Sequence, residues 1–169
     1  MTNDKITSAT IKEMKNQGEK IVALTAWDFA SAKTVESAGV EIVLVGDSLS
    51  MTIRGDSNTL KITLKDMIYH TRMVSKACVK ALVVADMPFM SCQVSPEQAT
   101  TNAGRFLKEG DAQAVKIEGG VKMADTVEKV TDSGIPVMGH IGFQPQTTAL
   151  SQGYKVQGRT ADGAIRLIE

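Results

Sequence analysis

Three carboxylates follow three successive apolar segments, and this arrangement could hold a metal ion. Asp47, Asp86 and Glu118 each come one or two residues after a short run of apolar residues. If those runs are parallel strands, the three side chains share one sheet edge, where neighbouring strands lie about 4.8 Å apart. Clustered like charges raise one another's pKa, and a hard divalent cation such as Mg²⁺ relieves that repulsion through oxygen ligands. The alternative for each acid is a helix N-cap or a solvated rim position.

Two further side chains belong to the same predicted edge. Lys116 precedes Glu118 by one strand period, so both point to the same face. A lysine inside the fold needs a counter-charge, which a substrate carboxylate or the acids could supply, and a plain ion pair with Asp86 or Glu118 is the alternative. His140 ends the fifth apolar segment and could be a general acid, a hydrogen-bond donor to substrate or a structural histidine.

Other residues of reactive types are weaker candidates for a functional role. His70 lies in a helical pattern and is interpreted as structural or exposed. Cys92 has no evident base beside it, so we assign it no nucleophilic role, and Cys78 and Cys92 are too few for a disulfide scaffold. The stretch 153–160 differs from a phosphate-binding loop by an Arg in place of Lys and is preceded by a polar loop in place of a strand. Both departures argue against nucleotide hydrolysis.

The elements that must position these residues alternate along the chain. The first helix-capping pattern is a capping box predicted at Thr10 and Glu13, which gives an N-terminal helix over about 9–17. A second box is predicted at Thr63 and Asp66, and Ser95 precedes a helix that runs to Gly110. Further helices are expected over about 123–133 and from 161 onward. The expected strands are 21–25, 42–45, 81–84, 114–117 and 135–138.

Alternating strands and helices predict an α/β fold with a parallel sheet. An open doubly wound sheet and a TIM (β/α)8-barrel are both compatible with this pattern. A complete barrel takes about 250 residues, whereas residues 1–169 supply about the first five β/α units of a single, partial barrel domain.

Composition narrows the function classes. The chain has 19 basic and 19 acidic residues and only 4% aromatic residues, which disfavours nucleic acid as a partner. No apolar run approaches the roughly 20 residues of a membrane helix, and the N-terminus lacks the pattern of a signal or transit peptide. We therefore expect a cytoplasmic protein with no membrane partner.

Six ordered groups of residues carry a family resemblance. VLVGDSLSMT, ADMPFM with SPEQA, VKIEGG, PVMGHIG and GYKVQGR occur in this order, and from about Ile11 to Glu169 the chain resembles the ketopantoate hydroxymethyltransferase family. The resemblance implies a (β/α)8 barrel after an N-terminal helix, in a cytoplasmic homo-oligomer that is typically a decamer. It implies transfer of a one-carbon unit from 5,10-methylenetetrahydrofolate to 3-methyl-2-oxobutanoate, giving 2-dehydropantoate in pantothenate biosynthesis.

The resemblance also assigns residues. It implies Mg²⁺ at Asp47, Asp86 and Glu118, with His140 at the substrate as the proposed catalytic residue. The oxo acid would be held by Asp47, Ser48, Asp86 and Lys116.

Two departures from the family pattern matter. Trp27 stands where the family has another aromatic residue, and the family's proton-abstracting glutamate falls beyond Glu169. We therefore expect the 169-residue chain alone to bind metal weakly and to turn over poorly or not at all. The alternatives are a Mg²⁺-dependent 2-oxo-acid C–C lyase of the isocitrate lyase kind, and an inactive truncated barrel fragment with an oligomer-forming role.

Overall fold

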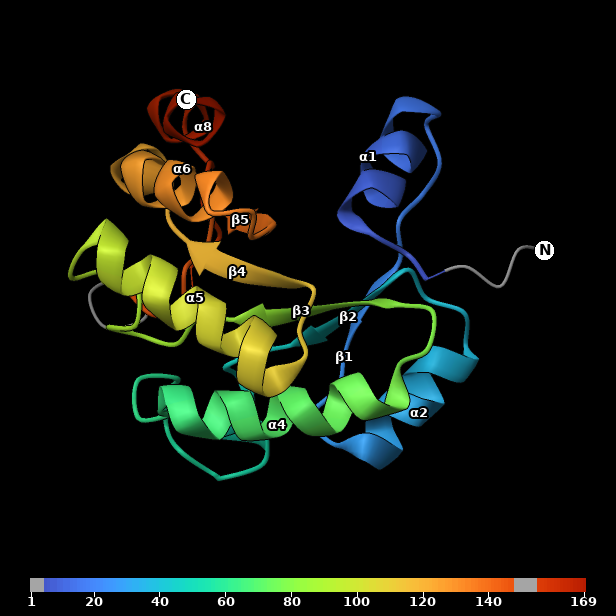
Figure 1. Cartoon of the computed structure of the whole chain (residues 1–169). Coiled ribbons are helices and arrows are strands. Elements are labelled where there is room, and N and C mark those ends of the chain that lie inside the picture. Colours follow the sequence, from blue (N-terminus) through green and yellow to red (C-terminus); the bar gives the residue numbers. More distant parts are fainter. Residues whose placement is uncertain (1–4, 148–154) are drawn as a thin grey trace.

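A five-stranded parallel sheet forms the centre of the molecule (Figure 1). The computed structural model describes residues 5–147 and 155–169. All five expected strands are confirmed, with bounds that differ by a few residues. They are β1 (Ala23–Thr25), β2 (Ile42–Val45), β3 (Leu82–Asp86), β4 (Ala114–Glu118) and β5 (Val137–His140).

Helices separate the strands along the chain. Their bounds are α1 (Ser8–Asn16), α2 (Phe29–Ser37), α3 (Leu49–Thr52), α4 (Leu64–Ala77), α5 (Pro96–Gly110), the 3₁₀ turn η1 (Val121–Met123), α6 (Ala124–Asp132) and α8 (Ala161–Ile168). The expected caps Thr63 and Ser95 both accept a hydrogen bond from the backbone of the first helical turn.

The start of α1 corrects the expected capping box. Thr7, not Thr10, is the N-cap, and Thr10 closes the box as the third helical residue. Two overlapping patterns were available in the sequence, Thr7 with Thr10 and Thr10 with Glu13. The earlier start agrees with the anchoring of the preceding residue, because the Ile6 N–H donates to the Lys80 carbonyl at 2.7 Å.

The strand order decides between the two fold classes. Neighbours in the sheet follow the chain order from β1 to β5, and every pair is parallel. A doubly wound sheet reverses its strand order at a switch point, and no reversal occurs here. Helices α2, α4, α5 and α6 pack in succession along one side of the sheet, while α1 stands apart from them (Figure 1). The fold is therefore of the barrel type.

The two faces of the sheet differ in what they bury. Val43, Val83 and Val115 face the helix layer and belong to the main core. Leu82 and Ala114 face the other way, where Ile6 and Ile11 from the N-terminal segment pack against them. Because side chains alternate along a strand, Asp86, Lys116 and Glu118 belong to this second, inner face. The inner face is thus apolar where the strands begin and charged where they end.

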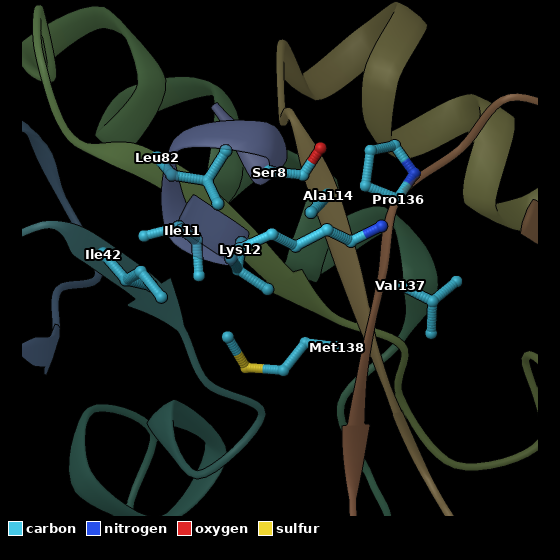
Figure 2. Close-up of a pocket in the computed structure, with 10 residues that line it drawn as sticks. Ser8, Ile11, Lys12, Ile42, Leu82, Ala114, Pro136, Val137 and Met138 are labelled. Carbon is cyan, nitrogen blue, oxygen red and sulfur yellow. The ribbon is translucent and has the colours of Figure 1, made fainter. Parts of the chain in front are cut away.

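An apolar cavity of about 220 Å³ lies at the amino ends of the strands (Figure 2). Helix α1 contributes Ser8, Ile11 and Lys12 to its wall, and the sheet contributes apolar side chains including Leu82 and Met138. The cavity therefore lies at the opposite end of the sheet from the acids. Within residues 5–147 and 155–169, no helix combines the length and apolar character needed to cross a membrane.

Candidate active site

The three predicted acids lie together at the carboxyl ends of neighbouring strands. Asp86 and Glu118 are the last residues of β3 and β4, and Asp47 follows β2 by two residues. All three are buried, and the Asp47 backbone N–H donates to Asp86 Oδ2 at 3.0 Å. None of them is the N-cap of a described helix, so the capping alternative is wrong for all three.

Burial and mutual repulsion disturb the titration of the two aspartates. Burial raises the pKa of Asp47 from 3.8 to about 7, and the negative charges of Asp86 and Glu118 add to that rise. Burial also raises the pKa of Asp86, although the nearby Lys116 ammonium opposes the rise. Both aspartates thus resist carrying their charge, which is expected for buried carboxylates with neighbouring negative charge.

Lys116 is the positive charge at this edge. It lies opposite Asp86 in the register of β3 and β4. Its Nζ is 3.1 Å from Asp86 Oδ1, which is an ion pair by distance, although the contact does not meet the geometry of a hydrogen bond. The simpler interpretation of Lys116, an ion pair with Asp86, is therefore present in the structure. Three carboxylates against one ammonium leave an excess of negative charge.

The lysine also determines the state of the histidine beside it. Lys116 Nζ lies 3.0 Å from His140 Nδ1. An ammonium group can only donate, so Nδ1 accepts, and the proton of the neutral ring resides on Nε2. Glu118 Oε1 is also near Nδ1, at 3.4 Å, but that contact is an ion pair only with a protonated ring. Of the three roles predicted for His140, the contact with Lys116 favours that of a hydrogen-bond donor through Nε2.

Gln146 is a residue of this site that sequence reasoning missed. It is 2% exposed although it lies in a loop, six residues after His140. Its Nε2 donates to Asp47 Oδ2 at 2.8 Å and to the Met87 carbonyl at 2.9 Å, and its backbone N–H donates to Glu118 Oε2 at 3.1 Å. No sequence period marks this position, and the two glutamines at 144 and 146, shortly after a strand end, were the available signal.

Ser48 lies beside the acids but faces a different space. It is exposed, and it borders a cavity of about 220 Å³ together with Gly46 and Trp27. A larger cavity of about 410 Å³ is bordered by Glu118 and Lys122. One cavity is therefore bordered by the acid Glu118, and the other by Ser48, the residue after Asp47.

The other candidate residues behave as structural groups. His70 Nδ1 contacts the Trp27 carbonyl at 2.6 Å, which supports its structural interpretation. Cys92 is buried, and burial raises the pKa of its thiol to about 11, which agrees with the absence of a nucleophilic role. In the stretch that resembles a phosphate-binding loop, residues 153 and 154 lie outside the described residues, and Arg159 is exposed just before α8.

Comparison with known proteins identifies the family. Residues 5–169 match the ketopantoate hydroxymethyltransferase family. The chain belongs to this family. It is 51% identical over 163 residues to a 3-methyl-2-oxobutanoate hydroxymethyltransferase of Dehalococcoides mccartyi, and 52% identical over 165 residues to that of Syntrophus aciditrophicus. These matches cover 96% and 98% of this chain, but 58% and 61% of the relatives.

Solved structures agree on the fold of this family member. A phosphonopyruvate hydrolase solved with oxalate and Mg²⁺ aligns with a TM-score of 0.68 at 12% identity, covering 94% of this chain and 66% of that chain. A 2,3-dimethylmalate lyase of the PEP mutase/isocitrate lyase superfamily aligns with a TM-score of 0.64 at 16% identity, covering 97% of this chain and 57% of that chain. At these identities the likeness shows the fold alone.

The family resemblance implies a bound Mg²⁺, and the oxygen ligands of the acid cluster can be compared with what this ion requires. Among the described residues, no group of three His, Cys, Asp or Glu side chains is arranged to hold a metal ion, so a three-carboxylate cage is not preformed. The donor type and charge nevertheless fit, because the oxygens are buried and Asp86 Oδ1 makes no hydrogen bond. Mg²⁺ commonly binds one or two carboxylates and completes its shell with water or substrate oxygens.

Proposed function

We propose that this chain provides the cation and oxo-acid half of a hydroxymethyltransferase site. The reaction would transfer a one-carbon unit from 5,10-methylenetetrahydrofolate to 3-methyl-2-oxobutanoate, giving 2-dehydropantoate. The observation that carries the proposal is the charge balance at the carboxyl edge. Asp47, Asp86 and Glu118 are buried, and among the described residues the ion pair at this edge is that of Lys116 with Asp86. With all three carboxylates ionised, two negative charges are left for a divalent cation to balance.

The roles of the residues follow from their positions. Asp47 and Asp86 would hold Mg²⁺ with Glu118 beside them, and the bound ion would supply Lewis-acid polarisation of the oxo acid's oxygens. Lys116 would stabilise negative charge on the substrate carboxylate, since its ammonium reaches the same edge. His140 would donate from Nε2 to a substrate oxygen, because Nδ1 is held by Lys116. Ser48 remains a proposed substrate contact at the flanking cavity.

The remaining parts of the proposal rest on the family. A base that removes the C3 proton of the oxo acid would be the glutamate that the family places beyond the matched residues. A cytoplasmic location agrees with the two free, buried cysteines, and a homo-oligomer is carried over from the family. The chain spans about three fifths of the length of its curated relatives, so the full activity is a property to test.

Binding and turnover measurements test this proposal separately. Calorimetry should show 3-methyl-2-oxobutanoate binding that requires Mg²⁺. Lys116→Gln should weaken that binding, and the exposed Lys108→Gln on α5 should leave it unchanged. Any turnover should require methylenetetrahydrofolate and yield 2-dehydropantoate by mass spectrometry. Oxo-acid cleavage without folate would favour the lyase alternative, and oxo-acid binding that is indifferent to Mg²⁺ would refute the proposal.

A further inference from the structure

Gln146 joins three of the loops and strand ends that form the acid cluster. Its side-chain nitrogen contacts Asp47, after β2, and the carbonyl of Met87, after β3. Its backbone nitrogen contacts Glu118 at the end of β4. One residue from the loop after β5 thus ties together the carboxyl ends of three preceding strands.

The amide of Gln146 is fully used. Both Nε2 protons have acceptors, and Oε1 accepts from Gln93 Nε2 at 3.1 Å. A buried side-chain amide with all of these partners holds one orientation, because rotating it would leave several polar groups unpaired. The neighbouring Asp47 carboxylate is held through Oδ2 and is therefore restricted in its rotation about the bond to Cβ.

We infer that Gln146 is a positioning residue of the cation site: it orients the Asp47 carboxylate, and its backbone N–H orients Glu118. This inference rests on the proposed function, since it assumes that Mg²⁺ binds at these acids. Outer groups that orient metal-binding carboxylates typically change metal affinity by about 10–100-fold when removed. Gln146 touches the carboxylates and has no contact with the reacting atoms in this account.

The experiment measures Mg²⁺ affinity in the substituted chain. Gln146→Leu removes both side-chain donors while the backbone N–H to Glu118 remains. Gln146→Asn keeps an amide that is one carbon too short to reach both Asp47 and Met87. Isothermal titration with MgCl2 alone should show binding weakened by about 10-fold or more in both variants. With Mn²⁺ as a spectroscopic probe, the electron paramagnetic resonance signal of the bound ion should change in shape.

Gln113→Leu is the matched control. Gln113 also joins two backbone segments, accepting from the Val83 N–H at 2.9 Å and donating to the Asp111 carbonyl at 2.7 Å, but it lies at the amino ends of the strands. Its loss should lower the melting temperature and leave Mg²⁺ affinity within about twofold of the parent chain. A merely structural role for Gln146 would give this same result.

The outcomes separate the inference from the proposed function. Mg²⁺ binding by the parent chain together with unchanged affinity in a folded Gln146→Leu chain would overturn the inference alone. If the Leu variant does not fold, the affinity of Gln146→Asn decides in the same way. Absence of Mg²⁺ binding in the parent chain would refute the cation site, and the inference with it.

Discussion

Replacing Asp47 by Asn tests the charge balance of the site through stability. The folded-state pKa of Asp47 is about 7, against an ordinary value of 3.8. The folded chain therefore binds a proton between about pH 4 and pH 7 that the unfolded chain has released. The contribution of Asp47 to stability is most favourable below pH 3.8, declines as the pH rises, and reaches its full penalty above pH 7.

The magnitude follows from the same two pKa values. At 1.36 kcal/mol per pKa unit, the penalty above pH 7 is at most about 4 kcal/mol, and at pH 5 it is less than about 2 kcal/mol. Asn has nearly the same shape as Asp, carries no charge, and can still accept from Gln146 Nε2 through its side-chain oxygen. Without metal, Asp47→Asn should therefore be more stable than the parent chain, and the gain should increase with pH.

Urea denaturation in EDTA, at about pH 5 and about pH 8, measures this gain, and repetition with excess MgCl2 tests the metal. Mg²⁺ should stabilise the parent chain and have little effect on Asp47→Asn. The exposed Asp132→Asn at the end of α6 controls for the change in net charge and should show neither effect. A gain that is the same at both pH values, or equal stabilisation of both chains by Mg²⁺, would refute the reasoning.

Three further predictions concern other parts of the molecule. Gly119→Ala should lower the stability, because Gly119 has a φ of +146° and an added Cβ would collide with Met123 Cγ. It should also lower Mg²⁺ affinity, because the strained backbone directly follows Glu118; unchanged calorimetry and melting temperature would contradict this. Glu36→Ala should lower the free energy of unfolding by about 1–3 kcal/mol in urea denaturation. The reason is that the Glu36 carboxylate accepts hydrogen bonds from the three backbone N–H groups of residues 79–81. A loss below about 0.5 kcal/mol would count against this prediction. Cys92 should react with iodoacetamide far more slowly than free cysteine at neutral pH, because burial raises its thiol pKa to about 11, and rapid labelling of the folded chain seen by mass spectrometry would show the opposite.

Local sequence patterns predicted most of the elements. The apolar runs marked all five strands, and Thr63, Ser95 and the start of α8 at Ala161 were predicted from capping and helical patterns. These succeeded because a cap or a buried strand is determined by residues within one turn or one strand. The start of α1 was misplaced because two overlapping capping patterns compete there. The hydrogen bond that anchors the preceding residue, Ile6, goes to residue 80, which is too distant in the sequence for a local pattern to reveal.

The candidate site was predicted in part. The position of Lys116 and Glu118 on one face follows from the two-residue period of a strand. That Asp86 shares this face depends on the register between β3 and β4, which places it opposite Lys116. The state of His140 did not follow, because it depends on how closely Lys116 approaches across the register of β4 and β5. Gln146 was missed because its partners are 28 to 99 residues away.

The sequence by itself determined which residue types end each strand and to which family the chain is similar, since both are recorded in short ordered segments. Only the tertiary structure decided that the strands run in chain order with the acids buried at one edge, because strand order arises from packing between distant segments. It also decided that one ammonium faces three carboxylates and that a loop glutamine holds two of them. Those contacts depend on distances between side chains, which no local pattern encodes.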